Sequence, residues 1–137
     1  VKASGYDLFK KNSFANRIEV PTIRRLFNNS LDGKRIVDLA CGSGDSSRVL
    51  ADLNPDEIIG ADLSEEMIKL ATSLNFNNSN PNYAKMKFYQ HDCISPLNLG
   101  HFDVVYSAHL LNYFKNEHDL LKAYKSMYDQ TKYGGFS

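Results

Sequence analysis

Short apolar runs alternate with segments of helical spacing along most of the chain. The runs at 34–40, 58–62, 86–90 and 102–107 are rich in β-branched and aromatic residues, which favour strands. Between them, apolar residues recur every three or four positions and predict helices that begin near residues 45, 64 and 116, with an earlier one near residue 21. This alternation predicts an α/β fold with a doubly wound, mostly parallel sheet and helices on both faces.

We expect residues 1–137 to form a single domain, because this length suffices for one core. The predicted organisation is an N-terminal helical segment over 1–33 and a sheet over 34–137. A fifth strand is expected to begin at Phe136, so the C-terminal strands of the sheet are apparently missing. A sheet cut short at strand five would leave an open edge, which predicts self-association or a partner chain that covers it.

Local signals predict where the helices begin and end and which faces they bury. Pro21 is expected in the first turn of its helix, Ser64 and Asn116 are N-cap residues, and Gly134–Gly135 is a stop signal. The apolar positions expected to face the sheet are Met67, Ile68 and Ala71 in one helix and Leu120, Leu121, Tyr124, Met127 and Tyr128 in the last.

A glycine turn follows the first predicted strand. Gly42 and Gly44 allow a sharp turn and the close approach of a ligand to the backbone. Asp45, Ser46 and Ser47 are N-cap residue types, and free N–H groups at such a helix start can receive a polar or anionic group. A structural loop that binds nothing is the alternative.

An acid at the end of the second strand favours a ligand. Asp62 lies 18 residues after Gly44, a separation that puts a carboxylate at the tip of the neighbouring strand of a βαβ unit. There it can accept both hydroxyl groups of a ribose. The two signals together predict a nucleoside-containing ligand over the first two strand tips.

The glycine pattern distinguishes between nucleoside ligands. Ser47 occupies the third glycine position of the dinucleotide fingerprint, which is therefore incomplete. The run Asp38–Gly44 instead resembles the acid-x-Gly-x-Gly-x-Gly motif of class I S-adenosylmethionine-dependent methyltransferases, with Ala40 in place of the first glycine. The resemblance covers Lys34 to Phe136. Within the family, the chain is similar in particular to the small-molecule branch related to quinone-biosynthesis methyltransferases. The resemblance implies a Rossmann-like methyltransferase fold.

The resemblance also implies a cofactor and its binding residues. The cofactor is S-adenosyl-L-methionine, and S-adenosyl-L-homocysteine is the product. Asp62 would bind the ribose, Leu63 and Met67 would pack against adenine, and Asp92 with the Cys93 N–H would bind the base edge. The full cofactor-binding set is Tyr6, Asp38, Ala40, Gly42, Gly44, Asp62, Leu63, Met67, Asp92, Cys93 and Ser107.

Some of these residues have simpler explanations. Tyr6 can anchor the N-terminus instead of touching a ligand, and Met67 can be part of the core. Asp92 can close an Asx turn at a strand end.

Methyl transfer from a sulfonium is an in-line displacement that depends on positioning. A general base is needed only when the acceptor retains its proton at neutral pH. His109, just past the fourth strand, is the best-placed candidate for a catalytic residue, and a packing or cofactor-contact role is its alternative. Ser107-Ala108-His109-Leu110 follows that strand in place of an Asn-Pro-Pro-aromatic run, and this disfavours adenine and glutamine as acceptors. A small-molecule acceptor is therefore expected.

Composition narrows the partners and the surroundings. Sixteen basic and sixteen acidic residues cancel, which predicts no avid nucleic-acid binding. No apolar run reaches the ~20 residues of a membrane span. Cys41 and Cys93 are expected to be free thiols in a reducing compartment, which favours a cytoplasmic protein, and no metal site is expected.

Two other functions compete with an enzyme of this kind. The first is a non-catalytic cofactor-binding subunit, or a fragment that needs a partner. The second is an NAD-dependent oxidoreductase, which Ser47 disfavours.

Overall fold

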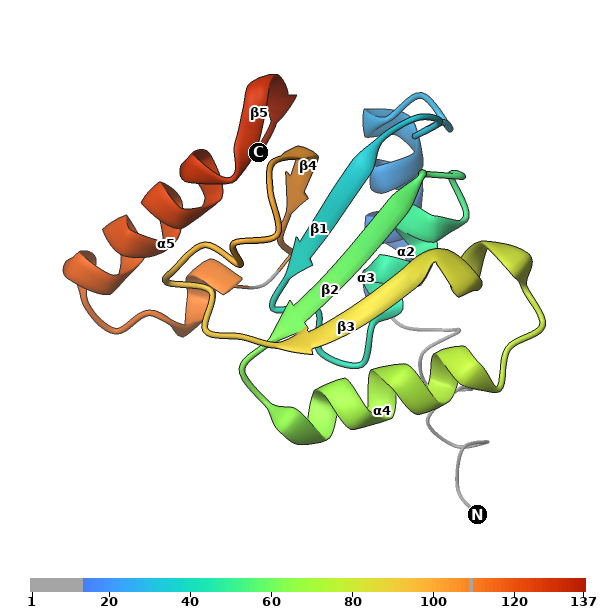
Figure 1. The fold of residues 1–137 in the computed structure, drawn as a ribbon, viewed down its shortest axis with the longest axis horizontal. Coiled ribbons are helices and arrows are strands. Elements are labelled where there is room, and N and C mark those ends of the chain that lie inside the picture. Colours follow the sequence, from blue (N-terminus) through green and yellow to red (C-terminus); the bar gives the residue numbers. More distant parts are fainter. Residues whose placement is uncertain (1–13, 109) are drawn as a thin grey trace.

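The structure, a computed structural model, describes residues 14–108 and 110–137 (Figure 1). Tyr6 and His109 lie outside these residues, so nothing follows for either from the structure. The elements in chain order are α2 (Phe14–Leu26), β1 (Arg35–Leu39), α3 (Asp45–Ala51), β2 (Glu57–Asp62), α4 (Glu65–Phe76), the 3-10 turn η1 (Pro81–Lys85), β3 (Met86–Gln90), β4 (Phe102–Tyr106), the 3-10 turn η2 (Leu110–Tyr113), α5 (Glu117–Asp129) and β5 (Thr131–Phe136).

The five strands form one parallel sheet in the order β3-β2-β1-β4-β5. The chain winds outward from β1 in one direction to β3, then returns to β4 on the other side of β1. The predicted doubly wound sheet is therefore confirmed. Asp38 of β1 pairs with Gly60 on one side and with Tyr106 on the other, so the carboxyl ends of β1, β2 and β4 lie together. Ligands of such sheets bind at this edge, where the winding direction changes.

Apolar side chains cover both faces of the sheet. Alternate residues of a strand point to opposite faces, so Ile36 and Val37 belong to different clusters. The Ile36 cluster includes Ile23 of α2 and Leu50 of α3, which lie behind the sheet in Figure 1. The Val37 cluster includes Ala123 of α5. Helices on both faces were expected and are confirmed.

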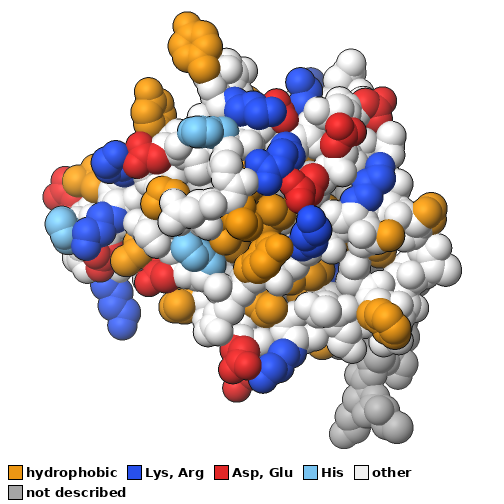
Figure 2. All heavy atoms as spheres, viewed as in Figure 1, with side chains coloured by type: hydrophobic (Ala, Val, Ile, Leu, Met, Phe, Trp, Pro, Cys, Tyr) orange, Lys and Arg blue, Asp and Glu red, His pale blue; other side chains and the backbone are white. Residues whose placement is uncertain are grey.

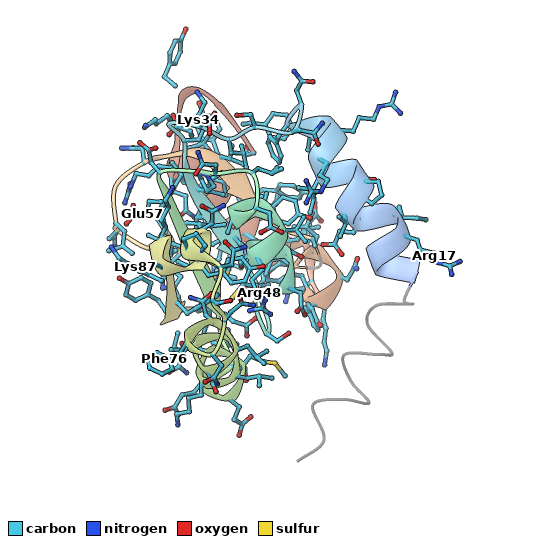
Figure 3. All side chains as sticks on the ribbon, turned by 90° about the vertical axis from the view of Figure 1, so that its right-hand side faces the viewer. Arg17, Lys34, Arg48, Glu57, Phe76 and Lys87 are labelled. Atoms are coloured by element: carbon cyan, nitrogen blue, oxygen red, sulfur yellow. The ribbon has the colours of Figure 1, made fainter. Side chains whose placement is uncertain are left out.

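Charged side chains link the first residues of three strands. Glu57 of β2 accepts a hydrogen bond from Arg35 Nε of β1 at 2.5 Å and one from Lys87 Nζ of β3 at 3.1 Å. Figure 3 shows Glu57 and Lys87 on the flank of the molecule opposite α2, which carries Arg17. These two hydrogen-bonded ion pairs thus connect β1, β2 and β3 near their amino ends.

Gly60, in the centre of β2, is a position where the sheet admits no side chain. A Cβ there would lie 2.5 Å from Phe88 Cδ1 and 3.0 Å from Cys41 Sγ. We expect Gly60→Ala to lower the free energy of unfolding by about 1–3 kcal/mol, because the Phe88 ring has to leave its packed position. Urea denaturation measures this loss. In a Phe88→Ala background the loss should shrink, and an unchanged loss would contradict the steric explanation.

The N-terminal helix corrects the prediction for Pro21. Pro21 lies inside α2 and not in its first turn, because the helix already begins at Phe14. A proline within a helix removes one backbone hydrogen bond and costs about 3 kcal/mol in an isolated helix. The missing bond is the one to the Arg17 carbonyl, and beside it Thr22 Oγ1 donates to the Ile18 carbonyl at 2.6 Å. Packing of Ile23, which is 2% exposed, holds the helix on the sheet despite the proline.

The buried faces of α4 and α5 also differ from the prediction. In α4, Ala71 is buried, Ile68 is half-buried and Met67 is exposed. In α5, the small residues Ala123 and Ser126 meet the sheet. Of the predicted inward residues, Leu121, Tyr124 and Tyr128 are exposed, whereas Leu120 and Met127 are half-buried and Met127 packs against the Val37 cluster. The reason is that α5 is apolar on more than one side, and close approach of the helix to the sheet favours the side with small residues.

The caps of these helices agree with the prediction. The Ser64 hydroxyl accepts from the Met67 N–H, and the Asn116 side chain accepts from the Asp119 N–H. The C-terminus of α5 differs, because the helix ends at Asp129 and not at the glycine pair. Gly134 and Gly135 lie within β5, which begins at Thr131 and not at Phe136.

β5 is the edge strand of this sheet and pairs irregularly with β4. Phe102 pairs with Thr131 and Val104 with Phe136, so β5 bulges between these two points. A cavity of 460 Å³ lies beside the bulge, between β5 and the segment after α2. Its lining includes Lys34 and Asp103, which lie at the amino ends of β1 and β4. The cavity is therefore at the opposite end of the strands from the glycine turn.

Candidate functional site

The turn after β1 has an unusual backbone. Ala40, Gly42 and Gly44 all have positive φ values, of 58°, 54° and 80°. Glycine adopts this conformation freely, whereas alanine pays roughly 1–2 kcal/mol. The strain at Ala40 explains why a glycine would suit that position. The alternation of left-handed residues turns the chain sharply from the buried strand into α3.

The start of α3 corrects the expected capping. Gly44 is the N-cap residue and no side chain caps the helix. Asp45, Ser46 and Ser47 lie in the first turn, and their side chains bond elsewhere. Ser43 Oγ donates to Asp45 Oδ2 at 2.7 Å, and Arg48 donates to Asp45 Oδ1 at 2.8 Å. The glycine takes the cap position because only the left-handed conformation connects this turn to the helix.

Asp62 joins the glycine turn to the end of β2. Its Oδ2 accepts from the Gly42 N–H at 2.8 Å and its Oδ1 accepts from the Ser64 N–H at 2.9 Å. The Cys41 N–H also donates to the Ala61 carbonyl at 3.0 Å. The two elements that the sequence singled out are thus in direct contact. The carboxylate is half-buried, so one side of it faces the surface.

The end of β3 lies next to Asp62. Asp62 pairs with Gln90 in the sheet, and its carbonyl accepts from the His91 N–H at 2.9 Å. Asp92 follows at once and is exposed. Its Oδ1 accepts from the Ile94 N–H at 3.2 Å, which is the Asx-turn contact. The two predicted aspartates therefore sit on neighbouring strand tips.

Apolar surface lies beside these carboxylates. Leu63 is 64% exposed and Met67 is 42% exposed. The core explanation for Met67 is therefore wrong. The side chain of Cys93, in contrast, is buried, so that only its backbone can take part in a contact at the surface.

Asp38 lies beneath the turn. The side chain is 1% exposed, and Ser47 Oγ donates to its Oδ2 at 2.5 Å. Burial raises the pKa of the Asp38 carboxyl from 3.8 to about 7, and the charges of Glu19 and Asp62 add to the rise, while the hydrogen bond from Ser47 opposes it. Asp38 therefore supports the turn from below and does not line an open surface. Ser47, at the third glycine position, is its buried partner.

Sequence reasoning missed a contact between three elements. Glu19 Oε1 of α2 accepts from Ser46 Oγ of α3 at 2.6 Å and from the Tyr106 hydroxyl of β4 at 3.2 Å. Burial, followed by the charges of Glu19 and Asp38, raises the pKa of Tyr106, so the phenol stays protonated and donates. No motif signals Glu19, because a single acid in a helix is usually a solvated residue.

The remaining candidates are placed as follows. Ser107 comes directly after β4, and its hydroxyl accepts from the Leu110 N–H at 3.4 Å, at the start of η2. Cys41 and Cys93 are free thiols, as expected. Burial raises the pKa of both, that of Cys93 to about 11, so neither forms a thiolate nucleophile near pH 7.

Metal-ligand clusters and membrane-spanning helices are both absent from the described part of the chain. In residues 14–108 and 110–137, no three His, Cys, Asp or Glu side chains gather as they would around a metal ion. Within the same residues, no helix has the length and apolar character to cross a membrane. Figure 2 shows basic and acidic side chains interspersed over the face it presents, without a large area of one sign.

Known proteins match the segment of the chain that contains the sheet and the glycine turn. Residues 36–135 match the family described as "Methyltransferase domain". The chain is 38% identical over 96 residues to "Putative methyltransferase YqeM" of Bacillus subtilis (strain 168), covering 69% of this chain and 36% of that protein.

Solved structures share the fold. A S-adenosylmethionine-dependent methyltransferase from Clostridium acetobutylicum superposes with a TM-score of 0.75 at 25% identity, covering 98% of this chain and 54% of that one. CalS10, an amino pentose methyltransferase from Micromonospora echinaspora solved with S-adenosylmethionine bound, has a TM-score of 0.75 at 17% identity, with coverage of 98% and 54%. The chain thus spans between about a third and about half of the length of these proteins.

Proposed function

Because the chain belongs to the family of S-adenosylmethionine-dependent methyltransferase domains, we propose that it binds S-adenosylmethionine at the carboxyl ends of β1, β2 and β3. We further propose that it transfers the methyl group to a small-molecule acceptor, and that residues 1–137 form one domain. Two structural neighbours, the amino pentose methyltransferase CalS10 and the glycopeptide N-methyltransferase MtfA, support a small acceptor. The narrower likeness to quinone-biosynthesis enzymes stays a prediction.

The observation that carries this proposal is the position of Asp62. Its two oxygens accept one backbone N–H each, from Gly42 and Ser64. A carboxylate has about four acceptor positions, so these bonds leave room for the two hydroxyl groups of a ribose. A Cβ added at Gly42 would meet nothing within 4 Å, which gives a ligand access to the backbone there. The residues present therefore fit a nucleoside.

The neighbouring residues complete the proposed cofactor site. Leu63 and Met67 would pack against adenine, while Asp92 and the Cys93 N–H would bind its polar edge. Ala40, Gly42 and Gly44 would let the rest of the ligand lie close to the backbone. Asp38 would hold the turn through Ser47, Ser107 would face the reactive end, and Tyr6 would cover the ligand.

When bound, the cofactor supplies an electrophilic methyl group on a sulfonium, which is a good leaving group. The protein then has to hold the acceptor in line with the bond that breaks, at near-attack distance. A base is required only for an acceptor that retains its proton at neutral pH. His109 is our proposed residue for that task, since it comes three residues after the end of β4 in the sequence.

Calorimetric titration tests the first half of the proposal. We expect S-adenosylhomocysteine to bind with a dissociation constant in the micromolar range, because the ligand has both sugar and base contacts. NAD should not bind, because Ser47 occupies the third glycine position of the dinucleotide fingerprint and its hydroxyl donates to Asp38 beneath the turn. Absence of S-adenosylhomocysteine binding, or binding of NAD in its place, would overturn the assignment. Transfer of a labelled methyl group to small-molecule fractions tests the second half.

A second candidate function is a cofactor-binding unit that needs further polypeptide for catalysis. It is supported by the partial coverage of the relatives and by the irregular edge strand β5. This candidate predicts normal S-adenosylhomocysteine binding but no methyl transfer by the chain alone. Sedimentation would show whether copies associate through the edge.

A further inference from the structure

We propose that Glu19 recognises the positive charge of the methyl donor and so distinguishes the donor from its neutral-sulfur product. The proposal rests on the proposed function, because it assigns a role at the same site. It starts from the contact in which Glu19 of α2 accepts from Ser46 of α3 and from Tyr106 of β4. These hydrogen bonds fix one carboxylate oxygen between the first turn of α3 and the side chain of the last residue of β4.

The strand order places Glu19 at the reactive end of the proposed site. The base and the sugar are assigned to β3 and β2, and the next strands along the sheet are β1 and β4. The rest of the donor, with its sulfonium and amino acid part, would therefore extend across β1 towards β4. Tyr106 is the last residue of β4 and pairs with Asp38 of β1. The Glu19 carboxylate accepts from the Tyr106 hydroxyl and from Ser46 in the first turn of α3, so it lies on the α2 side of the turn that follows β1, beside the proposed path of the donor.

The surroundings of Glu19 are acidic. Glu19, Asp38 and Asp62 are close enough for the charges of the first and the third to raise the pKa of the second. Like charges this near one another disfavour the ionised forms, and a cation beside them relieves the repulsion. The α-ammonium group is common to donor and product, whereas the positive sulfur belongs to the donor alone. A carboxylate beside the sulfur should therefore stabilise the donor complex selectively.

The Glu19→Gln variant tests the charge without removing the contact. Glutamine keeps a side-chain oxygen that can accept from Ser46 and Tyr106, but it has no charge. We expect the dissociation constant of S-adenosylmethionine to rise about tenfold, the size of one charge interaction at several ångströms in a partly solvated site. The dissociation constant of S-adenosylhomocysteine should change less than about twofold. The ratio of the two constants is the measured quantity.

Ser46→Ala is the matched control, because it removes one hydrogen bond and keeps the charge of Glu19. It should change the binding of both ligands by the same factor, as a positioning effect would. Equal losses for both ligands in Glu19→Gln would overturn the proposal and leave Glu19 a contact that only holds α2. If the wild-type chain binds neither ligand, the proposed function itself fails, and the two failures are therefore distinguishable. Thermal unfolding of each variant identifies any that does not fold.

Discussion

Replacing Asp62 by alanine is expected to weaken S-adenosylhomocysteine binding at least about 100-fold. Each hydrogen bond to a charged group contributes roughly 1.5–3 kcal/mol, and the ribose would lose two of them. The variant would also release the Gly42 and Ser64 amides, which the carboxylate holds at 2.8 and 2.9 Å. Both effects act in the same direction, because a loosened turn no longer presents its backbone to the ligand. Isothermal titration measures the loss.

Two further variants separate these effects. Asp62→Asn keeps the shape of the side chain and one acceptor oxygen, so it should lie between wild type and alanine in affinity. Glu66→Ala removes an exposed acid from the first turn of α4, close in sequence to Asp62, and should leave the affinity within about twofold of wild type. If Asp62→Ala binds S-adenosylhomocysteine as wild type does while remaining folded, the sugar is not bound at β2 and the site assignment is wrong.

The second large effect is a pH dependence of stability caused by Asp38. A carboxyl with a raised pKa holds its proton more tightly in the folded state than in the unfolded state. Its contribution to the free energy of unfolding is therefore largest below pH 3.8 and is lost as the pH rises to about 7. The shift corresponds to a loss on the order of 4 kcal/mol. Above pH 7 this loss is constant.

The Asp38→Asn variant isolates this dependence. Asparagine is neutral at every pH and retains an oxygen that can accept from Ser47. The stability of the variant relative to wild type should therefore increase between about pH 4 and pH 7, as measured by urea denaturation at several pH values. A difference that does not vary with pH would show that Asp38 titrates normally. At pH 8 the variant should be more stable relative to wild type than it is at pH 5.

Asp103→Asn is the control of opposite sign. The backbone N–H of Arg35 and then the Lys132 ammonium lower the pKa of Asp103. Such a carboxylate stabilises the folded state above pH 3.8 and loses that contribution as the pH falls. The loss of unfolding free energy caused by Asp103→Asn should therefore grow with rising pH, whereas the loss caused by Asp38→Asn should decline. The comparison removes effects of pH on the rest of the chain.

Local chemistry was sufficient to predict β1 to β4 and the edge of the sheet at which Gly42 and Asp62 meet. Runs of β-branched and aromatic residues identified β1, β2 and β4, because strands buried on both faces tolerate little else, whereas alternation of apolar and polar residues identified the more exposed β3. Right-handed crossovers between parallel strands then limit the order in which they can be joined. The same rule brought Gly42 and Asp62 to one edge, and the structure joins them by a hydrogen bond.

Helix faces were harder to predict, as α5 illustrates. Its apolar residues cover more than one side, so periodicity alone does not decide which side meets the sheet. The choice depends on how closely the helix can approach, and Ala123 allows a closer approach than Tyr124. The same limitation applies to Pro21, whose place within α2 depends on contacts made elsewhere in the helix.

The sequence by itself determined the alternating architecture, the glycine turn and the acid at the tip of β2, since each depends on residues close together in the chain. Only the tertiary structure decided that Asp38 is buried under Ser47, that Gly44 caps α3, and that Glu19 reaches Ser46 and Tyr106. The physical reason is the distance along the chain over which each effect acts. Backbone conformation and strand propensity act over a few residues, whereas burial and the field of neighbouring charges depend on segments that only folding brings together.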